Sequence, residues 1–134
     1  MLRPPPLSLI VLSPDIINNL NSMETEKITY DDFAKVEISL GTILSVEVVP
    51  DADKLLRLQV DFGEESPRQI LSGIREYYED PQVLVGKQCP FVTNLAPRTI
   101  RGLESNGMIL AANTEEAFAL FHPSVPLKNG TRLK

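Results

Sequence analysis

Residues 94–108 (NLAPRTIRGLESNGM) carry side chains whose types suit contact with RNA. Arg98 and Arg101 can form charge-assisted hydrogen bonds with phosphate, and amide or hydroxyl groups can bond to bases or ribose. Glycine lets a backbone amide approach a ligand closely. A polar surface loop whose glycines serve only turn geometry has the same composition. The residues alone leave these two interpretations equally open.

The sequence offers few residues that could catalyse a reaction. His122 is the only imidazole and lies far in sequence from the only thiol, Cys89, so no nucleophile and base are paired along the chain. Asp51 and Asp53 could hold a cation, but no further acids cluster with them, and we interpret both as turn residues. One Cys and one His cannot assemble a zinc site. We therefore expect a non-catalytic protein with no metal and no cofactor.

The net charge of −5 at first argues against a nucleic-acid partner, because phosphate binding usually leaves a basic surface. The charge is uneven, since residues 1–65 hold 5 Lys and Arg against 12 Asp and Glu, whereas residues 66–134 hold 8 against 6. A phosphate-binding surface should draw mainly on the second half. Ordinary scatter of charge over a solvated surface is the alternative reading of these counts.

The composition predicts one globular domain behind a leader. Residues 1–22 show no helical or strand periodicity, and Met23 could be an alternative translation start. We expect residues 1–27 to be a flexible or upstream-derived extension and residues 28–134 to fold. The longest early apolar run, Leu7–Leu12, is shorter than the ~18 residues that span a bilayer, so no membrane partner is expected. A single Cys cannot form an internal disulfide, which fits a reducing, cytoplasmic setting.

Alternation of apolar and polar residues predicts strands. Thr29 should cap a short helix. A long strand is expected over 34–49, with a bulge or bend at Gly41. Pro90 lies in another expected strand, where it requires an edge or non-hydrogen-bonded position. The remaining expected elements are strands over 55–62, 68–71, 87–94 and 108–112, a short helix within 75–85, a loop over 95–106, and two tail strands over 118–121 and 131–133.

Five short strands, with one helix between the third and the fourth, match the order of an OB-fold. The expected fold is therefore all-β: a five-stranded Greek-key barrel with a short helix between strands 3 and 4. A short N-terminal helix and a C-terminal β extension should flank this barrel.

Several blocks of the sequence resemble one known family. They are KITYDDFAKVEISLGTI, DADKLLRLQVDFG, SGIREYY, NLAPRTIRGLESNGMILAA and the closing NGTRLK. From about Ile28 to the end, in order and spacing, they resemble the tRNA-binding domain appended to methionyl-tRNA synthetases. The same domain occurs in stand-alone dimeric tRNA-binding proteins, in endothelial monocyte-activating polypeptide, at the start of bacterial phenylalanyl-tRNA synthetase beta chains, and in a small secretion-related chaperone family.

The resemblance implies a barrel that binds tRNA largely by shape, with little sequence preference and without chemistry of its own. It implies an auxiliary module acting in cis or in trans with the methionyl-tRNA synthetase catalytic subunit, and a homodimer to which residues 118–121 would contribute. The alternative on the same dimeric fold is a secretion-related peptide-binding chaperone that uses an apolar groove. The SGIR and NLAPR blocks favour the synthetase branch.

The resemblance also assigns residues. By position in the family's motifs, the expected tRNA contacts are Lys54, Asn94, Arg98, Ser105 and Met108, and Ser72 and Gly73 match the family's loop before the helix. Charge and position add Arg75 and Arg101 as expected phosphate contacts. Ser39 stands where many relatives carry a basic residue. Its presence would remove one phosphate contact and reduce the log-log salt slope of binding by about one unit.

Overall fold

The computed structural model describes residues 26–134, so the expectations for the leader and for a start at Met23 lie outside the described residues. The described residues fall into two units, 26–33 and 34–134. Thr29 Oγ1 accepts a hydrogen bond from the Asp32 N–H (3.1 Å). Thr29 therefore caps the short helix α2, Tyr30–Ala34, as predicted.

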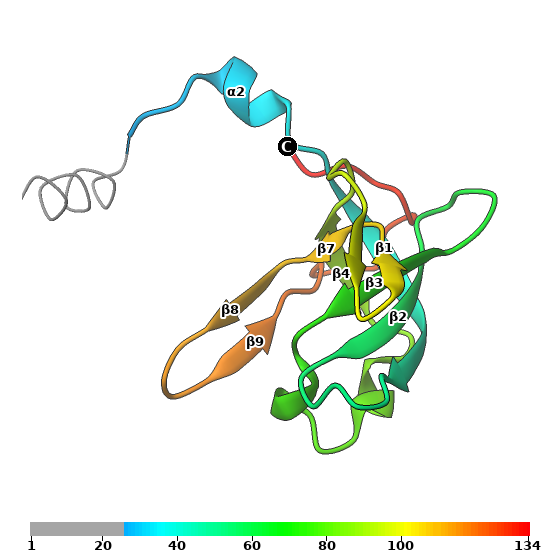
Figure 1. Ribbon diagram of the computed structural model, residues 1–134. Helices are drawn as coiled ribbons and strands as arrows, with labels where there is room; N and C mark the ends of the chain where they lie inside the picture. Colours follow the sequence, from blue (N-terminus) through cyan, green and yellow to red (C-terminus); the bar gives the residue numbers. More distant parts are fainter. Residues whose placement is uncertain (1–25) are drawn as a thin grey trace, which may run out of the picture. The chain divides into compact units, whose positions relative to one another are not determined.

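The second unit is an antiparallel barrel built on one long, bent strand (Figure 1). This strand, β1 (Ile38–Val48), pairs through its first residues with β4 (Gln88–Val92) and through its later residues with β2 (Leu56–Asp61). β3 (Arg68–Ser72) and β7 (Met108–Ile109) complete the sheet in the order β3-β2-β1-β4-β7. This is the five-stranded OB barrel that the strand order predicted.

The barrel core is aliphatic, with one aromatic pair. Leu56, Leu58 and Val60 alternate along β2 and are fully buried, as the period-2 pattern predicted. Phe62 meets Phe91 edge to face, with ring centroids 5.3 Å apart. Burial of each such side chain contributes about 1.5–3 kcal/mol. The strands are therefore held together by packing of their inward faces.

The bend in β1 differs in detail from the prediction. The register shifts between Ile43 and Ser45, so the bulge lies beyond Gly41. A Cβ at Gly41 would lie 2.6 Å from side-chain carbons of both Val60 and Phe62. Glycine is required there because two core side chains occupy the space that a side chain would need.

Pro90 occupies a position that is not hydrogen-bonded to β1, as predicted, and its carbonyl accepts the Leu110 N–H on the other side (3.2 Å). It lies opposite Leu40, whose N–H and C=O bond instead to residues 130–131 of the C-terminal tail, at 2.9 and 2.7 Å. The tail thereby fills an edge of β1 that β2 leaves open. The expected last strand is reduced to a single bridge between Ser39 and Arg132.

The connection from β3 to β4 holds two 3₁₀ turns where one helix was expected. They are η2 (Arg75–Tyr77) and η3 (Pro81–Leu84). Tyr78 is extended and separates them, while Asp80 caps η3 by accepting the Gln82 N–H (3.1 Å). Pro81 at the start of η3 favours a new turn over continuation of the first.

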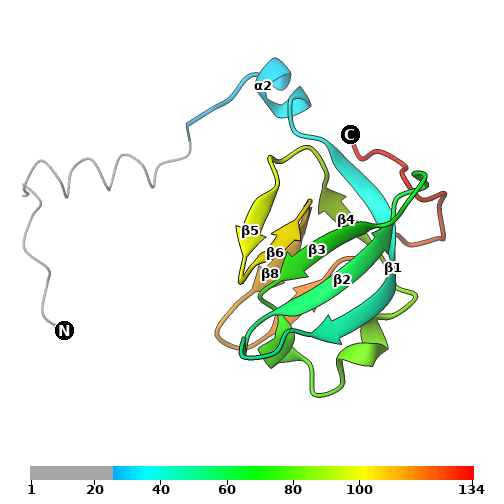
Figure 2. The same cartoon turned by 45° about the vertical axis from the view of Figure 1, so that its right-hand side comes forward.

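Residues 95–106 are not a plain loop, so that prediction was wrong. They contain a hairpin of β5 (Arg98–Ile100) and β6 (Leu103–Ser105), which we call the arm; Figure 2 shows it beside β3. The turn between its strands is Arg101-Gly102. Hairpin turns are usually signalled by Asn-Gly or Asp-Gly, and the Arg-Gly pair hides that signal.

A second hairpin projects from the barrel in Figure 1. It comprises β8 (Ala111–Asn113) and β9 (Phe118–Leu120). The strand expected over 108–112 is therefore two pieces, interrupted at Leu110. The Phe118 ring stacks on Tyr77 at 4.2 Å between centroids, which fastens the hairpin to η2.

Candidate nucleic-acid interface

A second, smaller hydrophobic cluster joins the arm to the β1–β2 loop, residues 49–55. Its centre is Leu71 of β3, which is only 6% exposed although it faces away from the barrel core that its neighbour Ile70 enters. The residues that pack in this cluster with Leu71 are Val49, Ala52 and Leu55 of the loop and Ile100 and Leu103 of the arm. The arm tip and the loop are therefore held side by side.

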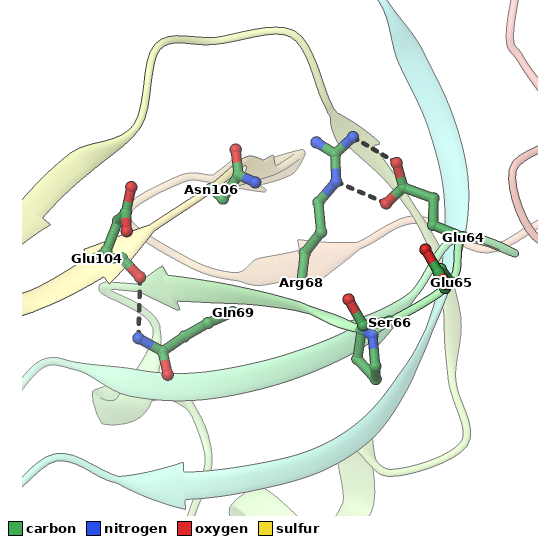
Figure 3. A pocket seen from close by; sticks show the side chains of 8 residues that line it. Glu64, Glu65, Ser66, Arg68, Gln69, Glu104 and Asn106 are labelled. Carbon is green, nitrogen blue, oxygen red and sulfur yellow. Dashed lines mark hydrogen bonds and ion pairs between the residues drawn. The ribbon is translucent and has the colours of Figure 1, made fainter.

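Hydrogen bonds tie the arm to β3 in place of a regular ladder. Ser105 Oγ accepts the Leu71 N–H (3.0 Å) and donates to a carbonyl two residues further on (3.3 Å). The Gln69 side-chain amide donates to the Glu104 carbonyl (2.9 Å), as Figure 3 shows, and the Gln69 carbonyl accepts the Asn106 N–H (2.8 Å). These bonds fix the base of the arm against β3.

Sequence reasoning missed Gln69 and Leu71. One signal was available for Leu71, because two adjacent apolar residues in a strand, Ile70 and Leu71, indicate that both faces of that strand are covered. Nothing local marks Gln69. Its role depends on Glu104, thirty-five positions away.

The arm tip presents arginine in a strained turn. Arg101 and Gly102 have positive φ angles of 53° and 78°, as a type I′ hairpin turn requires. Glycine adopts this conformation freely, whereas another L-residue loses about 1–2 kcal/mol there. Arg98 and Arg101 are exposed, and neither guanidinium has a hydrogen bond or ion pair with any of residues 26–134. Both are free to meet a ligand.

The β1–β2 loop brings further predicted residues to the same end of the barrel. Lys54 is exposed, and its carbonyl accepts the Arg75 N–H (3.2 Å). The Arg75 guanidinium donates to another loop carbonyl (3.3 Å), which supports the loop and leaves other N–H groups available. Ser72 is buried at the end of β3, and the position of a Cβ on Gly73 lies 3.9 Å from the Lys54 carbonyl. Lys54 thus lies in the loop, and Ser72, Gly73 and Arg75 lie next to it, beside the arm tip.

Asn94 and Met108 lie towards the opposite end of β1. Asn94 Oδ1 accepts the Glu37 N–H (2.8 Å), and its Nδ2 donates to the Lys35 carbonyl (2.6 Å). Met108 is 46% exposed and pairs with the end of β4, next to the start of β1. The nine predicted residues thus form a band along the arm and do not share one pocket. Within this band, the side chains of Asn94 and Ser105 are engaged by the fold.

An acidic groove of about 520 Å³ lies beside the arm, between the β2–β3 turn and β6 (Figure 3). Both carboxylate oxygens of Glu64 bind the Arg68 guanidinium, at 2.7 and 2.8 Å, and Arg68 also donates to a backbone carbonyl. The Arg68 hydrogen bond lowers the pKa of Glu64, against a smaller opposing effect of desolvation. Glu65 and Glu104 have no cation in the groove to balance them. The groove therefore disfavours phosphate, and a bound nucleic acid should not extend from the band of predicted residues into it.

Cys89 and His122, distant in sequence, meet in the structure. Cys89 Sγ lies 3.6 Å from His122 Nδ1, and this nitrogen lies 3.0 Å from the Gln88 carbonyl, to which it donates. Cys89 is fully buried, and burial raises the pKa of its thiol to about 11. A thiol held in this state is not an activated nucleophile at neutral pH. The pair is a packing contact.

The fold and the band together define a class of protein. In OB-folds, nucleic acids bind across strands 2 and 3 and the loops that join strands 1–2 and 4–5; here those loops are 49–55 and the arm. A family model described as "Putative tRNA binding domain" matches residues 38–132. The chain belongs to this tRNA-binding domain family.

The methionine–tRNA ligase of Methanoregula boonei is 50% identical over 111 residues, which are 83% of this chain and 16% of the ligase. That of Enterococcus faecalis is 48% identical over 97 residues, 72% of this chain and 14% of the ligase. The chain thus spans about a sixth of the length of such relatives.

Two solved structures align over their whole length. A MetRS related protein from Pyrococcus horikoshii is 33% identical, with a TM-score of 0.75 over 82% of this chain. Chaperone CsaA from Bacillus anthracis is 28% identical, with a TM-score of 0.71 over 81% of this chain. The chain is a tRNA-binding domain related to those of methionine–tRNA ligases. Among residues 26–134, no helix has the length and apolar character needed to cross a membrane.

Proposed function

We propose that residues 28–134 bind tRNA by its shape, with little dependence on sequence, through the β1–β2 loop and the arm. The observation that carries this proposal is the cluster around Leu71, which holds Lys54 next to an arm whose two arginines form no hydrogen bond or ion pair with residues 26–134. Contacts to phosphate position a nucleic acid without reading its sequence. A-form RNA is recognised mainly through shape and through its phosphates and 2′-hydroxyls.

The nine residues take different parts in this proposal. Lys54, Arg98 and Arg101 contact phosphates directly, with Arg75 beside them and Met108 offering an apolar contact. The other four shape the surface: the buried or bonded side chains of Ser72, Asn94 and Ser105, and the side-chain-free backbone of Gly73.

The strain at Arg101 supports a role in binding. Asn or Gly would suit its left-handed conformation better, and the exposed side chain forms no hydrogen bond or ion pair with residues 26–134 that would offset the cost. Local strain of this kind is often kept at functional sites. The conformational cost of arginine at the tip of the arm would be offset when its guanidinium binds a phosphate.

We further propose that the module works in the cytoplasm and performs no chemistry of its own. It would serve a methionyl-tRNA synthetase catalytic unit, in cis or in trans, by raising the local tRNA concentration. This proposal is supported by the sequence similarity between the chain and a segment that makes up about a sixth of such a ligase. The buried state of Cys89 beside His122 also favours a non-catalytic role.

A homodimer is the assembly that we propose. The β8–β9 hairpin and the following residue give an apolar surface beyond the barrel, with Phe121 48% exposed. A second copy of the chain would cover it and double the tRNA-binding surface. Light scattering at micromolar concentration should give twice the monomer mass, and a monomer mass would contradict the dimer.

A peptide-binding chaperone is the second candidate. An apolar groove of about 350 Å³ lies between the tail and the barrel, where Leu40, Pro90 and Leu127 line it. The similarity to chaperone CsaA agrees with such a use of the fold. The two candidates predict different ligands, so one set of experiments separates them.

The test of tRNA binding is a titration of the chain against several unrelated tRNAs and a single-stranded oligonucleotide of equal length. We expect similar affinity for every tRNA and weaker binding of the oligonucleotide. The double variant Arg98→Gln/Arg101→Gln should lose most of the affinity. Lys87→Gln/Lys128→Gln removes the same charge from two exposed positions outside the arm and the β1–β2 loop, and this variant should retain the affinity.

The contrary outcomes are equally specific. Equal binding by the two double variants would refute the assignment of the arm. Failure to bind any tRNA at low salt, together with suppression of the aggregation of an unfolded client protein, would support the chaperone.

A further inference from the structure

Leu71 is buried on a barrel strand but lies outside the barrel core. The barrel core includes Ile43, Leu58 and Ile70, whereas Leu71 lies on the outer face of β3 in the separate cluster with Val49. It is 6% exposed because the loop and the arm cover it. Its burial therefore depends on two surface segments and contributes little to closing the barrel.

Those two segments carry the basic residues of the proposed site. Ile100 and Leu103 flank the Arg101-Gly102 turn and pack on the same cluster as Leu55, which follows Lys54 directly. The base of the arm is fixed separately, by Ser105 and Gln69. Contact with Leu71 is thus what holds the far half of the arm against the loop.

We infer that Leu71 is a positioning residue for tRNA binding, which holds the arm tip and the β1–β2 loop as one surface and acts through Arg101. This inference rests on the proposed function. A preorganised arm meets the phosphate without losing conformational entropy on binding. Without the Leu71 side chain, the tip would have to be ordered by the ligand.

A double-mutant cycle tests this inference. In the wild-type background, Arg101→Gln should weaken tRNA binding about five- to eight-fold at 0.1 M salt, because one phosphate contact contributes about 0.7–0.9 to the log-log salt slope. In a Leu71→Ala background the same change should weaken binding less than about two-fold, since residues that act as a unit are non-additive.

The matched control is Leu84→Ala, which removes the same atoms from a residue of the barrel core that is 3% exposed. In that background Arg101→Gln should keep its full five- to eight-fold effect, because the arm remains seated. Leu71→Met, which conserves volume, should restore the wild-type behaviour. All titrations are made at a temperature at which circular dichroism shows each variant to be folded.

If Leu71→Ala does not fold, Leu103→Ala replaces it, because that side chain is half-buried on the arm itself. A full effect of Arg101→Gln in the Leu71→Ala or Leu103→Ala background would overturn the inference while leaving tRNA binding intact. Absence of tRNA binding by the wild-type chain would overturn the proposed function and this inference together. The two failures are therefore distinguishable.

Discussion

Replacing Arg101 by asparagine should stabilise the protein and at the same time weaken its binding to tRNA. Arg101 has a φ of 53°, where asparagine is several-fold more frequent than most residues. That preference corresponds to about 0.5–1 kcal/mol of stability. Because the arginine side chain forms no hydrogen bond or ion pair with residues 26–134, no such interaction is lost in exchange.

The expected sizes are measurable. For a domain of this length, the gain should raise the unfolding temperature by about 2–4 °C. Loss of one phosphate contact should reduce the log-log salt slope of tRNA binding by about 0.7–0.9. At 0.1 M salt this corresponds to an affinity about five- to eight-fold lower, with a smaller difference as salt rises.

Differential scanning calorimetry and a salt series of tRNA titrations provide the two readouts. Arg101→Lys is the matched control, because it keeps the positive charge and the strained backbone; it should leave the unfolding temperature and the salt slope close to those of the wild type. Unchanged affinity of Arg101→Asn would refute the phosphate contact. A lower unfolding temperature would refute the account of the turn.

Three further predictions concern the barrel. Gly41→Ala should cost about 1–3 kcal/mol in urea unfolding, because its Cβ would lie 2.6 Å from Val60 and Phe62 carbons; an unchanged midpoint would contradict this packing. Asn94→Ala should cost about 1–2 kcal/mol by breaking two hydrogen bonds, yet preserve the salt slope of tRNA binding; a reduced slope would show a direct contact. Burial raises the pKa of Cys89 to about 11. The stability that the neutral thiol contributes is therefore complete below the usual thiol pKa and is lost as the pH rises towards 11. Cys89→Ala should remove this alkaline loss of stability, and an identical pH profile of stability for the variant and the wild type would contradict the raised pKa.

Local sequence patterns predicted the strands of the barrel better than the hairpins attached to it. The alternation in β2 reflects burial of one strand face, so Leu56, Leu58 and Val60 could be assigned to the core in advance. The position of Pro90 followed from its missing N–H. The arm could not be predicted in this way, because its turn is Arg-Gly and its two short strands are held by contacts with β3 and the β1–β2 loop.

The chemistry of the candidate site was also only partly visible in the sequence. Side-chain type marked Arg98 and Arg101 as phosphate ligands, and the structure leaves both exposed. Type alone also marked Asn94 and Ser105, but their hydrogen-bonding groups are engaged by backbone far along the chain. Whether a polar side chain faces a ligand or the fold depends on such long-range partners, which local composition does not encode.

The most direct test of the central claim is a chemical-shift titration of the isotope-labelled chain with tRNA. We predict that the backbone amides of residues 53–55 and 98–103 shift first and furthest, whereas those around Glu64 in the acidic groove and Lys128 in the tail stay in place. Shifts concentrated on the tail groove, with the arm unmoved, would contradict the account.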